Sequence, residues 1–185
     1  LFYIIIAFSQ IYAKSAPSQS EAGYAMGLGF SPQIFTALLM YSAVSLAISI
    51  TISGKCIDKI GRRIWLIWTT VAVAIFGLAL PYFLENGTTV SLFWFLIIGM
   101  GLIGMGYGPL SSFLPELFPT HVRYTGASLT YNIAGLFGAS VAAIIALPLN
   151  ANYGLKGVGI YLTLNAVLSL IGLWFITETR DRQLL

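Results

Sequence analysis

The stretch GKCIDKIGRR, residues 54–63, concentrates charge in a chain that carries very little of it. It holds five of the fifteen charged residues among 185. Overall, 58% of the residues are hydrophobic and 8% are charged, whereas soluble domains carry about 25% charged residues. Such a chain lacks the polar side chains needed to cover a surface in water. The composition therefore predicts a protein whose solvent is the lipid bilayer.

Six apolar stretches lie between the charged and Pro/Gly-rich segments. Most approach the roughly 20 residues that cross a hydrocarbon core of about 30 Å as a helix. The first is shorter and begins inside an apolar run without Met, so we interpret the sequence as a fragment, and it does not resemble a signal peptide. The expected fold is all-α and polytopic, with six transmembrane helices at about 1–16, 32–53, 64–84, 90–114, 124–149 and 158–177.

The distribution of basic residues predicts the orientation of these spans. If successive loops face opposite sides, one side receives seven cations and the other receives two, Lys14 and Lys156. Cytoplasmic loops carry the excess of Lys and Arg, so we expect the 54–63 loop, the 115–123 loop and the C-terminus to be cytoplasmic. The net charge of +3 then reflects topology and not nucleic-acid binding. The seven cations are Lys55, Lys59, Arg62, Arg63, Arg123, Arg180 and Arg182.

Small residues recur at helical spacing inside two of the spans. In the fourth, Gly104 and Gly108 form a small-xxx-small pair, which allows helices to approach closely. Static packing is the simpler interpretation of such faces, and a sliding or cavity-lining surface is the functional one. The second span carries the longer of these faces, made of Ser42, Ser45, Ser49 and Ser53.

The segment 54–63 must reverse the chain between two spans in about ten residues. Gly54 and Gly61 suit tight turns and close backbone contacts. Asp58 is placed to reach the N-terminus of the following helix or to pair with a neighbouring span. Arg62 and Arg63 can bind carboxylates from other loops. The alternative is that all five charges only anchor the topology.

Three segments in order resemble one transporter family. The pattern G-x-x-x-D-K-x-G-R-R at 54–63 resembles the cytoplasmic loop signature of the major facilitator superfamily, which follows the second and eighth helices of twelve. PELFPTHVRYTGAS, residues 115–128, resembles the loop after the tenth helix in the metabolite:proton symporter branch, and a related pattern occurs in the sugar-porter branch. TETRD, residues 177–181, is similar to the segment after the twelfth helix. The resemblance identifies the whole chain as a C-terminal six-helix half whose partner is a missing N-terminal half.

Two features depart from the family pattern. His121 stands where relatives usually carry Arg, which replaces a fixed cation with a titratable imidazole. A solvated His without a role is the simpler interpretation. The segment 15–30 is also longer than expected between the seventh and eighth helices.

The resemblance implies a mechanism of alternating access. In this superfamily two halves, each built from two inverted three-helix repeats, rock around a substrate site at the membrane midplane. Charges at the cytoplasmic rim would then form a latch that closes one state and separates in the other. The residues expected in this latch are Gly54, Asp58, Gly61, Arg62, Arg63, Glu116, Arg123 and Glu178.

The symporter branch implies proton-driven transport of a small organic acid or zwitterion. Alternatives are a hexose transporter of the sugar-porter kind and a truncated half-protein that does not transport. On the fifth span, Ser128, Asn132, Gly135 and Ala139 share a face, while Tyr131 should point elsewhere and Asn165 should bond a neighbouring helix. Lys14 shares a face with Gln10 and Tyr3, although it can also snorkel. The substrate-binding candidates are Asn132, Gln10, Lys14 and Ser128.

Other classes of protein fit poorly. The chain has one His, one Cys and no metalloprotease-like motif, so we expect neither an enzyme nor a metal site. A single Cys allows no intrachain disulfide. We expect no cofactor, with the proton as the coupling ion, and a multi-pass protein of the bacterial inner membrane.

Overall fold

The computed structural model describes residues 1–175, apart from the side chains of Ser112, Phe137, Ala139, Ser140 and Ala143. Within that range the chain is helical and forms no β-strand. The segment 177–181 and the expected latch residue Glu178 lie outside the described residues. In chain order the elements are η1 (Ile4–Phe8, a π-helix), α1 (Ser9–Lys14), α2 (Pro32–Ile60), α3 (Arg62–Glu85), α4 (Thr89–Glu116) and α5 (Arg123–Phe175).

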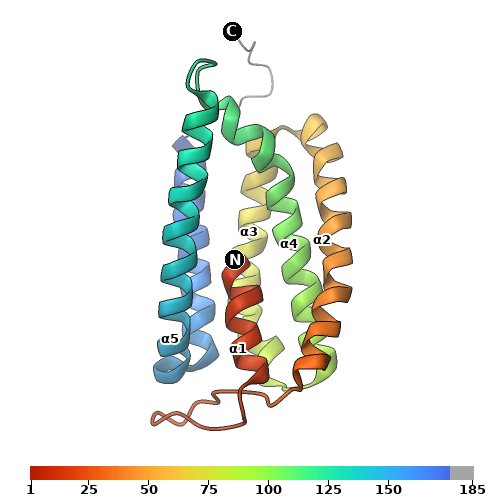
Figure 1. Ribbon diagram of the computed structural model, residues 1–185, viewed down its shortest axis with the longest axis vertical. Coiled ribbons are helices and arrows are strands. Elements are labelled where there is room, and N and C mark those ends of the chain that lie inside the picture. The colour runs from red at the N-terminus through yellow and green to blue at the C-terminus, as the bar shows by residue number, and fades with distance from the viewer. Residues whose placement is uncertain (176–185) are drawn as a thin grey trace.

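Four helical stretches are long and apolar enough to cross a membrane: α2, α3, α4 and Ile144–Phe175 within α5, while Ile4–Lys14 is a shorter apolar helix. The helix α5 is interrupted at Gly154, where φ is 67° and ψ is −170°. This backbone conformation strongly favours glycine. The chain reverses at this residue, and Figure 1 shows α5 as two antiparallel limbs. The coarse expectation of an all-helical membrane protein is confirmed.

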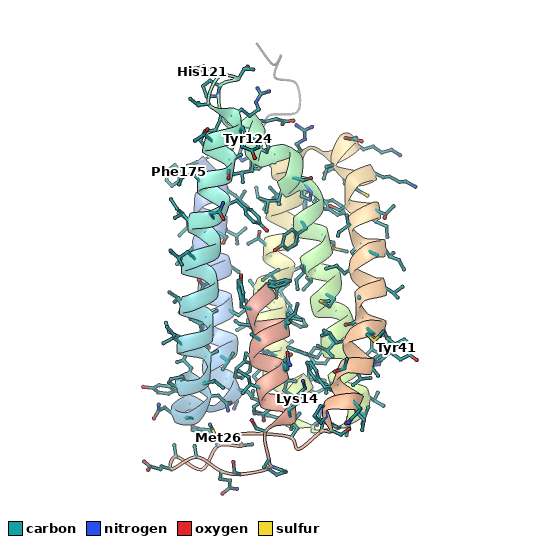
Figure 2. The ribbon with its side chains drawn as sticks, viewed as in Figure 1. Lys14, Met26, Tyr41, His121, Tyr124 and Phe175 are labelled. Carbon is teal, nitrogen blue, oxygen red and sulfur yellow. The ribbon has the colours of Figure 1, made fainter. Side chains whose placement is uncertain are left out.

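Different loops and helix ends lie at the two ends of the bundle (Figure 1). One end, which we call the Arg62 end, holds the α2–α3 corner, the loop between α4 and α5, and Phe175. The opposite end, the Lys14 end, holds the loop 15–31, the turn between α3 and α4, and the reversal at Gly154. His121 and Lys14 mark the two ends in Figure 2.

The corner between α2 and α3 is tighter than the sequence suggested. Instead of a ten-residue loop, only Gly61 separates the helices, with φ of 99°. Residues 54–60 continue α2, although Gly54 is a poor helix former. Gly54 is therefore helical, and a Cβ there would meet no atom within 4 Å, so the expected close contact at Gly54 is wrong. The N-cap of α3 is Gly61 with no side-chain cap, so Asp58 does not cap that helix.

The serine face of α2 packs directly against the glycines of α4. A Cβ added at Gly104 would lie 2.6 Å from the Leu46 carbonyl oxygen, so only glycine permits this approach. Ser45 Oγ donates to the Ile97 carbonyl at 3.0 Å, and Ser53 is fully buried. The interpretation of these small residues as a packing surface is confirmed.

One carbonyl of α4 joins three helices. Pro109 has no N–H, so the carbonyl four residues earlier, that of Met105, loses its usual intrahelical donor. Ser53 Oγ of α2 donates to this carbonyl at 3.0 Å, and Trp65 Nε1 of α3 donates to it at 3.0 Å. The proline therefore creates an acceptor that α2 and α3 use to hold α4.

The helix α3 makes a similar close contact with α5. A Cβ at Gly77 would lie 2.6 Å from Thr163 Oγ1, and that hydroxyl donates to the Ala74 carbonyl at 3.1 Å. The residue four positions after Gly77 is Pro81, which again removes an intrahelical donor. Small residues and a proline thus let the second limb of α5 lie against α3.

The loop 15–31 lies across the Lys14 end and is tied to helices on both sides. Its Leu28 N–H donates to the Tyr12 carbonyl at 3.1 Å. On the other side, Asn150 of α5 is 1% exposed, and its Nδ2 donates to the Ala25 carbonyl at 3.0 Å. The ring of Tyr24 lies against Gly154, where a Cβ would come within 2.6 Å of it. The loop is therefore packed onto the reversal of α5.

Candidate functional site

An ion pair connects the beginning of α3 to the end of α4 at the Arg62 end. Arg62 Nη1 donates to Glu116 Oε2, and the two side chains are 21% and 15% exposed. Two residues of the expected latch are thus brought together within the described part of the chain. Because both charges are mostly removed from water, loss of either partner would leave the other poorly solvated.

Arg63 connects the same corner to the end of α5. Its Nε donates to the Leu173 carbonyl at 3.0 Å, and its Nη2 donates to the Trp174 carbonyl at 2.9 Å. A guanidinium carries five N–H donors in a fixed fork, so it can bind two neighbouring main-chain oxygens at once. Sequence reasoning expected Arg63 to bind carboxylates. Among its described contacts it also donates to main-chain oxygens, which no residue pattern reveals.

The remaining latch candidates lie apart from this pair or play a different part. Arg123 Nε donates to the Phe118 carbonyl at 3.4 Å, so it holds the loop between α4 and α5. Asp58 is exposed on the last turn of α2. Gly61 makes the corner that brings Arg62 and Arg63 to their partners. His121 is exposed in the α4–α5 loop, at the tip of the Arg62 end (Figure 2).

A cavity of about 550 Å³ lies between the first helix, α4 and both limbs of α5. Among the described residues, no charged side chain lines it. Its lining is otherwise apolar or small, and includes Gly135. The side chains that bring polar atoms to it are Tyr3, Tyr107, Tyr131, Tyr161 and Asn165.

This cavity does not use the polar residues that the sequence singled out on α5. Asn132 is not among its lining residues; its Nδ2 donates to the Ser128 carbonyl one turn earlier at 2.8 Å. Ser128 lines a separate depression near Arg123. Tyr131, which the sequence predicted to point away from Asn132, lines the cavity, whereas Asn132 does not.

Asn165 also differs from expectation. It lines the cavity, and its Nδ2 donates to the Tyr161 carbonyl of its own helix at 2.8 Å, not to a neighbouring helix. The tyrosines that line the cavity come from positions more than 20 residues apart in the sequence, so their convergence was not predicted. Their only sequence signal was their recurrence inside otherwise apolar spans.

The other two substrate candidates lie together at the Lys14 end. Gln10 and Lys14 line a depression of about 490 Å³ with Ser15. Lys14 Nζ lies 5.4 Å from the centroid of the Phe35 ring, within the range of a cation–π interaction. Lys14 thus lies beside a ring of α2 and also lines the depression.

Comparisons with known proteins agree on one family. The model of the family described as "Sugar (and other) transporter" matches residues 23–185. A Haemophilus influenzae protein named as a candidate metabolite transport protein is 88% identical over all of this chain, which spans 41% of that relative. The Escherichia coli inner membrane metabolite transport protein YhjE is 40% identical over all of this chain and 40% of its own length. The proline/betaine transporter of Salmonella typhimurium is 30% identical over 87% of this chain and 34% of its own length.

The chain spans about two fifths of the length of the first two of these relatives. All three are named as transport proteins and none as an enzyme. No solved structure matches the chain significantly.

Proposed function

The chain belongs to the sugar (and other) transporter family of the major facilitator superfamily, and we propose that it forms the C-terminal half of a proton-coupled transporter for small carboxylates or zwitterions. The relatives' names support the substrate class, since they include metabolite and proline/betaine transporters. In this proposal the opposing half of the transporter lies on chain not present in this sequence.

The proposed half contains six helices in two inverted repeats. The reversal at Gly154 supports six, because it divides α5 into two limbs. With Ile4–Lys14 as the first helix, the repeats are the first helix with α2 and α3, and α4 with the two limbs of α5. The cation-rich Arg62 end faces the cytoplasm in this arrangement, as the excess of basic residues favours.

The observation that carries the proposal is the set of ties at the Arg62 end. The corner that contains the signature segment binds the end of α4 through Arg62 and Glu116, and the end of α5 through Arg63. These ties are polar and lie at one end of the bundle, so they can open without disturbing the apolar packing. Polar contacts that separate in one state and re-form in the other are one way in which such proteins switch.

The strength of the Arg62–Glu116 tie suits a latch. Hydrogen bonds to charged groups contribute about 1.5–3 kcal/mol net, which corresponds to a shift of roughly 10- to 150-fold between two states. A tie in that range populates the closed rim without trapping it. The strength of this contact depends on two opposite charges, whereas an apolar contact in its place would not.

Lys14 supports the carboxylate component of the proposal. Lys14 lines a depression at the Lys14 end together with Gln10, and a cation there is a candidate for recognising an anionic group. The acidic residues within 1–175 are Glu21, Asp58, Glu85 and Glu116, which lie in a loop or near helix ends. A coupling proton would therefore use a group near an end of this half or on the opposing half.

Uptake by the full-length transporter in proteoliposomes tests the proposal. Labelled acetate, proline, glycine betaine and glucose are supplied with an inward proton gradient, with and without a protonophore. We expect uptake of at least one carboxylate or zwitterion that the protonophore reduces strongly. Glucose uptake alone would indicate the sugar-porter alternative, and no uptake of any compound would contradict the proposal.

A further inference from the structure

The loop 15–31 at the Lys14 end has two parts that are held by different neighbours. Residues 27–30 return along the end of the first helix, and residues 18–26, which we call the loop tip, reach the reversal of α5 (Figure 1). Within the loop tip, Gln19 and Ala25 form an antiparallel bridge. The loop tip is therefore a small hairpin closed by its own main-chain contacts.

The returning part of the loop is attached firmly to the first helix. The Leu28 N–H donates to the Tyr12 carbonyl at 3.1 Å, and the Phe30 N–H donates to the Ala13 carbonyl at 2.8 Å. These carbonyls lie in the last turn of α1, where intrahelical donors are lacking. Leu28 and Phe30 also pack against the hydrophobic core. This part of the loop therefore forms one packed unit with the first helix.

The described contacts between the loop tip and α5 are weaker. Asn150 Nδ2 donates to the Ala25 carbonyl at 3.0 Å. The same nitrogen lies 3.7 Å from the sulfur of Met26, which is labelled in Figure 2. The ring of Tyr24 lies against Gly154 but remains 42% exposed. One side-chain hydrogen bond, one sulfur contact and one half-covered ring thus hold the loop tip in place.

This position of the loop tip also leaves a polar atom of α5 unsatisfied. Asn150 is 1% exposed, and its Oδ1 is buried without a hydrogen-bond partner among the residues that the structure describes. A buried acceptor without a donor carries a desolvation cost, which is relieved when water reaches it. The contact with α5 therefore combines a favourable hydrogen bond with an opposing cost. Of the two attachments of the loop, the one to α5 is the easier to break.

We propose that the loop tip is a latch of the Lys14 end. It rests on α5 while this end is closed, and it separates from α5, still attached to the first helix, when this end opens. The inference rests on the proposed transport function and adds a counterpart to the Arg62–Glu116 tie at the opposite end. Segments that act as lids are held by contacts of low local stability, as the loop tip is.

Cross-linking tests whether the loop tip must separate from α5. The full-length transporter, without its other cysteines, carries Ala25→Cys together with Asn150→Cys, and a short bifunctional thiol reagent that a reductant cleaves joins the two. We expect cross-linking to lower uptake in proteoliposomes at least about fivefold, the lower end of typical coupling between sites, and the reductant to restore it. Ala25→Cys with Gln19→Cys is the matched control, because this pair lies within the loop tip. Joining it should change uptake little.

Labelling of Asn150→Cys alone measures how often the loop tip separates, because this position is buried at the contact. An impermeant maleimide is added to the outer side of spheroplasts that contain the full-length transporter. Glu116→Gln weakens the tie at the Arg62 end, so it should favour opening of that end and closure of the Lys14 end. We therefore expect Asn150→Cys to react several-fold more slowly in the Glu116→Gln background. Asn152→Cys, at an exposed position two residues later, is the matched control and should react at the same rate in both backgrounds.

Unchanged uptake after complete joining of positions 25 and 150 would overturn the inference, because the loop tip would then be a static cover. An equal loss of uptake on joining positions 19 and 25 would overturn it as well. So would a labelling rate at position 150 that Glu116→Gln leaves unchanged, and this measurement decides alone if the paired variant does not fold. Proton-driven uptake before cross-linking would leave the proposed function intact in each case. Failure of all uptake before cross-linking would remove the proposed function itself.

Discussion

The Met105 carbonyl should respond to mutation in a way that depends on Pro109. Ser53→Ala and Trp65→Phe each remove one of the two 3.0 Å hydrogen bonds to this oxygen. Side-chain hydrogen bonds between membrane helices average about 0.6 kcal/mol, so either single substitution should cost about that much. Together they leave a buried carbonyl without a side-chain donor, and an unsatisfied acceptor costs about 1–3 kcal/mol. The double variant should therefore lose more than the sum of the single variants.

Pro109→Ala tests the physical reason for this coupling. Alanine restores an N–H four residues after Met105, so the carbonyl regains an intrahelical donor. In that background Ser53→Ala and Trp65→Phe should be nearly additive, and the coupling free energy of about 0.5–2 kcal/mol should disappear. The comparison uses differences between variants, so changes in helix bending caused by the alanine itself cancel.

The free energies come from reversible unfolding of the full-length transporter in mixed detergent micelles, followed by tryptophan fluorescence and by circular dichroism. Trp65→Phe changes the fluorescence signal, so circular dichroism provides the common scale. A coupling of the same size with and without the Pro109→Ala substitution would refute the idea that the proline frees this carbonyl. Additive single substitutions in the protein that retains Pro109 would refute it as well.

Three further predictions concern packing, topology and the latch. Gly104→Val should destabilise the bundle by about 1–3 kcal/mol through overpacking. Gly106→Val should cost much less, because a Cβ at Gly106 would meet nothing within 4 Å. Unfolding measurements that rank the two variants in the opposite order would contradict the observed packing. Lys59→Cys and Asn86→Cys are each made in a background without the native cysteine. The two new cysteines should react with an impermeant maleimide from opposite sides of the membrane. Labelling of both from the same side would overturn the proposed topology. Glu116→Gln should slow translocation several-fold with little change in substrate affinity, since the pair lies at a helix end; a large loss of affinity at an unchanged rate would argue against the latch.

The long helices were predictable because lipid imposes a simple length and composition. The spans of α2, α3 and α4 follow from apolar stretches bounded by charge, as the bilayer thickness requires. The ends of α2 were not predictable in the same way. Residues 54–60 are polar enough to suggest a loop and yet compatible with a helix, and only the φ of 99° at Gly61 determines where the chain turns.

The charged end of the bundle was predictable in composition but not in pairing. The positive charge concentrated near 54–63 indicated the end of the bundle at which several loops lie, and Glu116 was a reasonable partner for Arg62. The contacts of Arg63 with the Leu173 and Trp174 carbonyls depend on where α5 lies in space, which no local pattern records.

The aromatic cavity was missed for a related reason. Tyr3, Tyr107 and Tyr131 are separated by up to 128 positions, so no helical period connects them. Individually each tyrosine fits an interfacial or packing role. Only the packing of four helical segments places their rings around one space. The tie between Asn150 and the loop 15–31 was hidden in the same way, because its partners are 125 residues apart.

Substrate-induced proton movement tests the central claim most directly. Proteoliposomes containing the full-length transporter are suspended in weakly buffered medium without an imposed gradient, and a pH electrode follows the medium after glycine betaine is added. The account predicts alkalinisation of the medium that matches labelled uptake in time and is abolished by a protonophore. Labelled uptake at the same rate with no change in external pH would contradict proton-coupled transport.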